Sequence, residues 1–374
     1  MGFVMKERGK YRARYRDPLG REHSKSFSRK ADADRFLVEV AADKLHGSWI
    51  DPRSADIPLA AWAETFLSLC RRLSPGTQET YRRDLERYVL PRFGAYRLGR
   101  LPAEEIEQWL NDEVAAGLAP SSVHRHYRTL RRMLAVAVQK QKIHHNPCDR
   151  VDPPRVPHRD MVFLGWDEVA RLADAHSERF RTLIYLAVDS GMRWSELVGL
   201  RRSRVDVRRG KVRVTEQLIQ LRDGTFVRKE PKTAAGVRSI SVAAFTARLL
   251  AEHFERFTGS SPDDLVFPNA AGNPLMAPSF LTHHFGPARR SAGLSCRFHD
   301  LRHSSVALAI AGGAHPKAIQ ARMGHASINV TLDRYGHLFP ELDEAIATAF
   351  DRELDAACRR QASNVVHASF SGSP

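Results

Sequence analysis

The sequence predicts a multidomain protein that is mainly α-helical with small antiparallel sheets, an α+β fold class. Three observations lead to this prediction. A chain of 374 residues is long enough for two or three domains, each with its own core. Apolar residues recur at helical spacing through most of the chain, whereas a stretch near residue 12 and two within 211–242 alternate with period two. Two polar, proline-containing segments, 51–58 and 151–157, interrupt these patterns and indicate domain boundaries.

The pattern of residues 1–56 predicts a small module that consists of a three-stranded sheet and one helix. Tyr11–Arg16 alternates as a strand does, Asp17–Gly20 is typical of a turn, and Ala31–Leu45 has helical spacing. The first thirty residues contain ten Lys/Arg and three Asp/Glu, which favours contact with a polyanion. The strand would present three arginines on one face as candidate DNA-binding residues: Arg12, Arg14 and Arg16. The competing interpretation is an edge strand protected by its charge.

Residues 57–150 predict a helical domain with one basic helix face. Within Val123–Val138, apolar residues from Val123 to Val138 fall on one side at 100° per residue. Three arginines fall opposite and are further candidate DNA-binding residues: Arg125, Arg128 and Arg132. Such a face is also typical of ordinary solvated helices, but residues 71–100 are basic as well, with eight Arg to three acids.

Residues 151–160 predict a linker, residues 161–358 a third domain, and residues 359–374 a flexible tail. In the third domain, Trp166–Ser190 and Phe245–Phe257 are expected to be helices, with a strand-rich, arginine-rich interval between them. Glu341–Ala357 is expected to form an amphipathic helix, which could pack on its own domain or on a neighbouring protomer. Its apolar stripe consists of Leu342, Ile346, Phe350 and Leu354.

Composition narrows the class of partner. The 58 Lys+Arg exceed the 43 Asp+Glu and give a formal charge of +15, which favours nucleic acid first and an anionic membrane second. No run of 18 apolar residues and no apolar signal core are visible, so we expect a cytoplasmic protein without a membrane partner. The four cysteines are far apart, which argues against a disulfide framework and a cysteine zinc site.

Two short segments combine residues that suit phosphate chemistry. Arg193 and Glu196 lie three residues apart just after Gly191, where a helix is expected to stop, so the carboxylate could hold the guanidinium. His299 and Arg302 lie one turn apart at an expected helix start, where backbone N–H groups favour an anion. His299 and His303 are four residues apart, a spacing that also occurs in zinc sites, but the segment between them lacks the glutamate that metalloproteases need.

Two more residues stand further downstream. His325 follows Gly324, which is expected to end a helix, and Tyr335 comes ten residues later. Taken singly, each is more often a structural residue. Their ordered combination is more informative than either one.

The motifs occur in one order: Gly191-Met192-Arg193-Trp194-Ser195-Glu196-Leu197, Pro231-Lys232-Thr233, His299-Asp300-Leu301-Arg302-His303, Gly324-His325, and Thr331-Leu332-Asp333-Arg334-Tyr335-Gly336-His337. This series resembles the catalytic domain of the tyrosine recombinases, the phage-integrase family. The helical segment before it resembles that family's SAM-like core-binding domain. The first fifty residues resemble the arm-binding domain of phage-type integrases.

The resemblance implies an enzyme that cuts and rejoins DNA strands at specific sites without metal, ATP or another cofactor. Tyr335 matches the nucleophile, which conserves bond energy in a covalent 3′-phosphotyrosyl link. Arg193 and Arg302 match the arginines that clamp the phosphate, and Glu196 matches the support of Arg193. Lys232 matches the general acid, and Lys229 is the alternative for that role. His299 matches the histidine that aids proton transfer to or from the tyrosine, and His325 matches a hydrogen-bond donor to the scissile phosphate. His303 and His337 are expected to be supporting or structural.

The implied partners are double-stranded DNA, at core and arm attachment sites, and three further copies of the chain in a homotetramer. A directionality factor and a DNA-bending host protein are further candidate partners. The expected role is integration and excision of a prophage or integrative element. The alternatives are a Xer-like chromosome or plasmid dimer resolvase, a type IB topoisomerase, and a catalytically inactive DNA-binding protein. The module at residues 1–56 favours an integrase over a resolvase.

Overall fold

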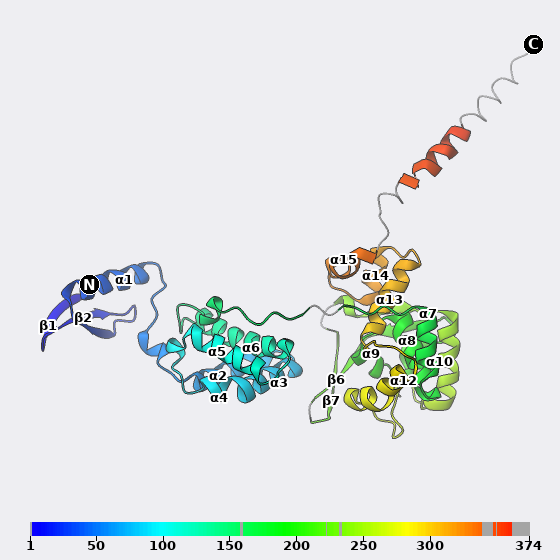
Figure 1. Ribbon diagram of the computed structural model, residues 1–374, viewed down its shortest axis with the longest axis horizontal. Coiled ribbons are helices and arrows are strands. Elements are labelled where there is room, and N and C mark those ends of the chain that lie inside the picture. The colour runs from blue at the N-terminus through cyan, green and yellow to red at the C-terminus, as the bar shows by residue number, and fades with distance from the viewer. Residues whose placement is uncertain are drawn as a thin grey trace, which may run out of the picture. The chain divides into compact units, whose positions relative to one another are not determined.

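The computed structural model describes residues 2–157, 160–221, 223–231, 234–338, 347–348 and 350–360. The chain divides into two compact units, an N-terminal unit of residues 1–159 and a C-terminal unit of residues 160–374 (Figure 1). Helices dominate both units and every sheet is antiparallel, which confirms the predicted α+β class. Among the described helices, none is both long enough and apolar enough to span a bilayer.

The N-terminal unit begins with a three-stranded sheet in the order β1-β2-β3, followed by one helix. These elements are β1 (Phe3–Glu7), β2 (Lys10–Arg16), β3 (Glu22–Phe27) and α1 (Lys30–Leu45). Ala13 and Tyr15 of β2 are buried on the face toward α1, and Tyr15 packs against Phe36 of that helix. The edge-strand interpretation of β2 is wrong, because β1 and β3 are hydrogen-bonded to its two sides.

The rest of the N-terminal unit is helical. Its helices are α2 (Leu59–Leu69), α3 (Pro75–Asp84), a π-helical turn (Leu85–Val89), α4 (Leu90–Phe93), α5 (Ala103–Ala115) and α6 (Pro120–Gln139). The core lies where α6 meets the other helices and includes Trp62, Phe66, Phe93, Leu130 and Leu134. The indole of Trp62 donates to the carbonyl of Met133 at 3.1 Å, which joins α2 to α6.

The C-terminal unit is built around α8 (Glu178–Ser190), which packs against α7 (Trp166–Asp174), α10 (Ala244–Phe257) and α13 (Asp300–Ala311). The single helix expected over Trp166–Ser190 is therefore two helices. The break falls at His176, whose ring bonds the carbonyl of Leu172 at 2.7 Å, and Ser177 is extended and begins the next helix. The remaining helices are α9 (Trp194–Val198), α11 (Ala277–Phe280), a π-helical turn (Leu281–Phe285), α12 (Gly286–Ser291), α14 (Pro316–Met323) and α15 (Asn329–Tyr335).

Two small sheets occupy the strand-rich interval. One has the order β4-β5-β8 and the other is the β6-β7 hairpin. Their strands are β4 (Val205–Asp206), β5 (Lys211–Val214), β6 (Gln217–Gln220), β7 (Phe226–Lys229) and β8 (Arg238–Ser241). In β8, residues 238 and 240 are buried and residues 239 and 241 are exposed, as period-two alternation requires.

Residues 350–360 are helical and overlap the segment Glu341–Ala357, for which an amphipathic helix was expected. Phe350 and Leu354 of the expected apolar stripe are 64% and 62% exposed. The other two stripe residues, Leu342 and Ile346, lie outside the described residues. In the structure, the described part of the stripe is thus not covered by its own unit.

Candidate active site

A left-handed glycine after α8 places the first candidate residues. Gly191 has φ 63° and ends α8, as the sequence predicted. The chain then turns directly into α9, where the backbone N–H of Arg193 donates to the Glu196 carboxylate at 2.9 Å. This local bond fixes both side chains at the start of one short helix.

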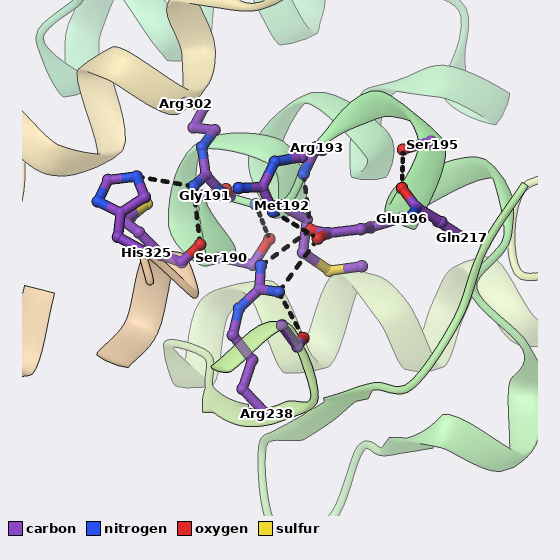
Figure 2. Close-up of polar contacts among 12 residues, drawn as sticks. Ser190, Gly191, Met192, Arg193, Ser195, Glu196, Gln217, Arg238, Arg302 and His325 are labelled. Atoms are coloured by element: carbon purple, nitrogen blue, oxygen red, sulfur yellow. Dashed lines mark hydrogen bonds and ion pairs between the residues drawn. The ribbon is translucent and has the colours of Figure 1, made fainter. Parts of the chain in front are cut away.

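Glu196 holds two guanidiniums at once (Figure 2). Arg193 Nη1 lies 2.9 Å from Oε1, and Arg238 of β8 donates from Nη1 and Nη2 to the two carboxylate oxygens at 3.1 and 2.9 Å. The Glu196 side chain is 3% exposed. Burial by itself raises the pKa of Glu196, but the hydrogen bonds and charge of Arg238, with those of Arg193, hold the pKa below its usual value. The carboxylate therefore stays ionised and keeps both arginines in place.

Arg302, in the first turn of α13, has no carboxylate partner of its own among the described residues. Its guanidinium donates to the carbonyls of Gly191 and Met323, the latter at 2.7 Å, and Nη2 lies 3.1 Å from Nε2 of His325. Burial, followed by repulsion from Arg193, lowers the pKa of Arg302 to about 9. The guanidinium is thus fixed but electrostatically uncompensated, which suits a group that receives an anion.

His325 is placed by a second left-handed glycine. Gly324, with φ 65°, ends α14 as expected, and His325 follows it. A guanidinium can only donate, so Nε2 of His325 accepts from Arg302, and Nδ1 donates to Oγ1 of buried Thr331 at 2.9 Å. Burial first, then the charges of Arg302 and Arg193, lower the pKa of His325 to about 4.

Tyr335 is the last residue of α15 and is 2% exposed, among Val306, Ile319 and Met323. Burial raises the pKa of Tyr335, and the charge of Arg302 opposes this shift. Its hydroxyl lies 2.6 Å from Nδ1 of His303. His303, expected to be supporting or structural, is therefore in direct contact with the candidate nucleophile.

His299 lies at the start of α13, and its ring meets that of His303 edge-on with centroids 5.0 Å apart. Burial, followed by the charge of Arg302, lowers the pKa of His299. Among the described residues, the side-chain hydrogen bond to the Tyr335 hydroxyl comes from His303 rather than from His299.

An open cavity of about 410 Å³ lies over these groups. It is lined by Arg193, Glu196, Gln217, Pro231, Gly236, Gly324, His325, Ala326 and Val330. Arg193, which lines the cavity, shares the Glu196 carboxylate with Arg238, and that carboxylate acts on Arg302 only through its charge. The surplus of positive charge makes the cavity suited to an anionic phosphodiester.

Lys232, the predicted general acid, lies outside the described residues. Its neighbour Pro231 lines the cavity, and β7 ends just before it at Lys229, the rival lysine.

Sequence reasoning missed Arg238. The sequence does contain a signal for it. Arg238 is two residues before Ile240 in an alternating strand, so both side chains lie on the buried face of that strand. Such a residue needs a buried partner, which is Glu196, and Arg238 also donates to the carbonyl of Arg322 at 2.7 Å.

The candidate DNA-binding arginines lie in the N-terminal unit. On β2, Arg12 pairs with Glu7 and Arg14 with Glu22, while Arg16 donates to the carbonyl of Gly20. On α6, Arg128 and Arg132 are exposed, and Arg125 bonds Asp84 at 3.2 Å. A role in DNA binding stays a prediction for all six.

The fold and the comparisons with known proteins define a class of protein, the enzymes that exchange DNA strands. Residues 163–341 match the phage integrase family, and residues 62–141 match the N-terminal SAM-like domain of phage integrases. The chain belongs to the phage integrase family of tyrosine recombinases, which are site-specific recombinases, so the family and activity predicted from the sequence are confirmed.

Relatives include both integrases and a recombinase of the Xer type. A putative prophage phiRv2 integrase of Mycobacterium tuberculosis is 28% identical over 355 residues, covering 92% of this chain and 93% of the relative. The tyrosine recombinase XerC of Xanthomonas campestris is 27% identical over 320 residues, covering 82% of this chain and 92% of the relative.

Solved structures share the fold. The Tn1549 transposon integrase in complex with transposon right end DNA has a TM-score of 0.68 at 21% identity, covering 78% of this chain and 98% of that one. A lambda integrase tetramer bound to a Holliday junction has a TM-score of 0.55 at 20% identity, covering 85% and 90%.

Proposed function

We propose that this recombinase is an integrase that joins a mobile element to a host chromosome through a covalent 3′-phosphotyrosyl intermediate on Tyr335. The observation that carries the proposal is the gathering of three guanidiniums, those of Arg193, Arg238 and Arg302, around one carboxylate, that of Glu196, beside a cavity that Arg193 lines. Tyr335 belongs to the same site, since it packs in one buried cluster with Met323, whose carbonyl accepts from the Arg302 guanidinium.

Each residue has a distinct role in the proposed cleavage. Arg193 and Arg302 bind the nonbridging oxygens of the scissile phosphate, where charge builds up during attack. Glu196 and Arg238 hold Arg193 in its orientation. Lys232 is the acid that protonates the leaving 5′ oxygen. His325 donates a hydrogen bond to the scissile phosphate, and His299 assists proton transfer.

His325 can take up its role only after a proton shift. Its Nε2 accepts a hydrogen bond from Arg302 in this structure. An incoming phosphate favours the protonated imidazole, because a nearby negative charge raises the pKa of a histidine from its low value of about 4. His325 would then donate from Nε2 to the phosphate.

The N-terminal part supports an integrase over a resolvase. We assign residues 1–56 to arm-type sites, residues 57–150 to the core site and residues 161–358 to catalysis, with 151–160 as the linker. Tethering two DNA-binding parts raises their effective concentration at paired sites.

We further propose that four copies act together on DNA, because two duplexes require four strand cuts. The lambda integrase tetramer on a Holliday junction has the same fold and supports this assembly. The exposed Phe350 and Leu354 offer an apolar contact for a neighbouring protomer.

A suicide duplex with a nick beside the cleavage site tests the nucleophile. We expect the wild-type chain to form a covalent adduct with DNA and Tyr335→Phe to bind the duplex without forming one. An adduct with Tyr335→Phe would overturn the assignment.

Deleting residues 1–56 tests the arm-binding role. The deletion should preserve cleavage of a core site and reduce integration between full sites; unchanged integration would contradict that role.

A further inference from the structure

Among the described residues, the side chain that is hydrogen-bonded to the Tyr335 hydroxyl is an imidazole. Nδ1 of His303 lies 2.6 Å from the hydroxyl oxygen, and both residues are buried, at 6% and 2% exposed. His303 is one helical turn after His299 on α13, and Tyr335 ends α15. The contact thus joins two helices that are 32 residues apart in sequence.

The two histidines of α13 occupy different places. Because they are four residues apart, they lie on the same helix face, and their rings touch edge-on. His299 is on the side of Arg302, whose charge is the second cause of its lowered pKa. His303 is on the side of the hydroxyl.

We propose that His303 is the residue that accepts the proton of Tyr335 during strand cleavage and returns it during religation. The inference rests on the proposed function, in which Tyr335 is the nucleophile. A neutral imidazole with its proton on Nε2 accepts the hydroxyl hydrogen bond at Nδ1, so the acceptor for the proton lies 2.6 Å from the hydroxyl oxygen.

Cleavage exchanges two bonds and moves two protons. The O–H bond of Tyr335 breaks and its proton forms a bond to Nδ1 of His303, while the phenolic oxygen bonds to phosphorus. The bond from phosphorus to the 5′ oxygen breaks, and that oxygen takes a proton from the acid assigned above, Lys232. Cleavage leaves an imidazolium and a neutral amine, and religation reverses both transfers.

The electrostatics keep the proton on the tyrosine until a phosphate is present. Burial, then the neighbouring His299, lowers the pKa of His303 to about 4, and burial raises the pKa of Tyr335. The other charged groups that act on His303 are Asp300, Arg334 and Arg297. Bonding of the phenolic oxygen to phosphorus makes its proton strongly acidic, so the transfer occurs in the transition state rather than in the resting enzyme.

Three variants of the full chain separate proton transfer from positioning. His303→Asn retains an acceptor oxygen for the hydroxyl but cannot take its proton, and His303→Ala removes both functions. The control is His283→Ala, which removes an exposed histidine on the π-helical turn Leu281–Phe285, outside the site. We expect both His303 variants to form the adduct with the suicide duplex a hundredfold to ten-thousandfold more slowly, at unchanged DNA affinity, and the control to match wild type.

Two further readouts identify the proton involved. In His303→Ala the adduct rate should rise with pH, because hydroxide replaces the missing base. A substrate with sulfur in place of the bridging 5′ oxygen needs no acid, so it should restore Lys232→Ala and leave the His303 variants slow.

A wild-type rate in His303→Asn would reduce His303 to a positioning residue and overturn the proposal. Restoration of the His303 variants by the sulfur substrate would also overturn it, since the residue would then serve the leaving group. If wild type itself formed no adduct, the proposed function would fail instead. DNA binding by each variant reports whether it has folded.

Discussion

Two buried carboxylates, one in each unit, hold a pair of arginines in the same manner. Asp84, at the end of α3, accepts from Arg83 at 2.7 Å and from Arg125 at 3.2 Å. Glu196 accepts from Arg193 and Arg238, each at 2.9 Å. Each cluster also contains a guanidinium that donates from Nη2 to Nε2 of a histidine at 3.1 Å, Arg125 to His126 and Arg302 to His325.

The clusters differ in the hydrogen-bond partner of the histidine's other ring nitrogen, Nδ1. Nδ1 of His126 bonds the carboxylate of Glu113 at 2.8 Å, whereas Nδ1 of His325 bonds the hydroxyl of Thr331. Two arginines and two carboxylates make the first cluster neutral. Three arginines and one carboxylate leave the second with a surplus of two positive charges.

The comparison indicates that the same local chemistry can serve either stability or catalysis. A neutral cluster is complete within the protein and ties α3, α5 and α6 together. A charged cluster is complete only when an anion arrives, and its rigid hydrogen bonds mean that little reorganisation is needed at that moment. Variants of the two clusters should therefore fail in different assays.

The largest effect is expected for Glu196→Gln. Loss of the carboxylate leaves Arg238, only 6% exposed at its side chain, without a counter-charge and frees Arg193. We expect the free energy of unfolding of the C-terminal unit to fall by about 3–5 kcal/mol, and adduct formation to fall more than a hundredfold. Urea titration of the full chain, with hydrogen exchange of α9, measures the first, and the suicide duplex measures the second.

Glu178→Gln is the matched control, because its carboxylate pairs with Arg256 on the surface of the same unit, with side chains 68% and 55% exposed. It should change the stability by less than about 1 kcal/mol. A Glu196→Gln chain as stable and active as this control would refute the view that Glu196 organises the site.

The Glu196 cluster also shows which parts of the site a sequence can predict. Arg193 and Glu196 are three residues apart, and a glycine cap precedes them, so local rules and motif resemblance suffice. Arg238 is 42 residues from Glu196, and His303 is 32 residues from Tyr335. These contacts depend on how strands and helices pack, which spacing along the chain does not encode.

The same distinction applies to the fold. The α1, α6 and α10 helices were predicted because their apolar periodicity is uninterrupted. The break between α7 and α8 was missed, because His176 and Ser177 interrupt the helix through hydrogen bonding and backbone conformation while the apolar pattern continues. The arginines of β2 concealed that the strand is central, since their charge is equally typical of an edge strand; Arg12 and Arg14 are half-buried and Arg16 is exposed.

A smaller loss is expected for Asp84→Asn. The buried carboxylate also accepts from Thr129, at 3.3 Å, but Arg125 remains 42% exposed at its side chain and can be solvated when its partner is lost. We expect the free energy of unfolding of the N-terminal unit to fall by about 1–3 kcal/mol. Adduct formation by DNA-bound enzyme should be unchanged, and a loss of cleavage there would remove the functional contrast between the clusters.

Acid should weaken the C-terminal unit through its buried histidines. Burial is the main cause that lowers the pKa of His253, His303 and His325 to about 4. Between the unfolded value near 6.5 and pH 4, the unfolded chain binds more protons than the folded chain, so stability falls as the pH falls through this window. His253→Gln, which changes a histidine outside the site, should flatten the pH dependence of urea unfolding; an unchanged slope would exclude this contribution.

The smallest effect, and the most discriminating one, separates two arginines on the same face of α6. Arg128 is exposed and forms no ion pair within the described part of the chain, whereas Arg125 is held by Asp84 and His126. If Arg128 contacts a phosphate, Arg128→Ala should weaken binding to a core site and reduce the slope of log affinity against log salt by about 0.9. Its effect on unfolding should be negligible.

Arg125→Ala should show the reverse, with a loss of stability in the N-terminal unit and little change in the salt slope. Arg131→Ala is the control for both, because Arg131 forms its ion pair with exposed Asp149 and has no contact with the Asp84 cluster in the described part of the chain. Equal salt slopes for Arg125→Ala and Arg128→Ala would mean that the Asp84 cluster also presents its arginine to DNA. The neutral cluster would then be a second phosphate-binding device, with a carboxylate that orients the guanidinium as Glu196 orients Arg193.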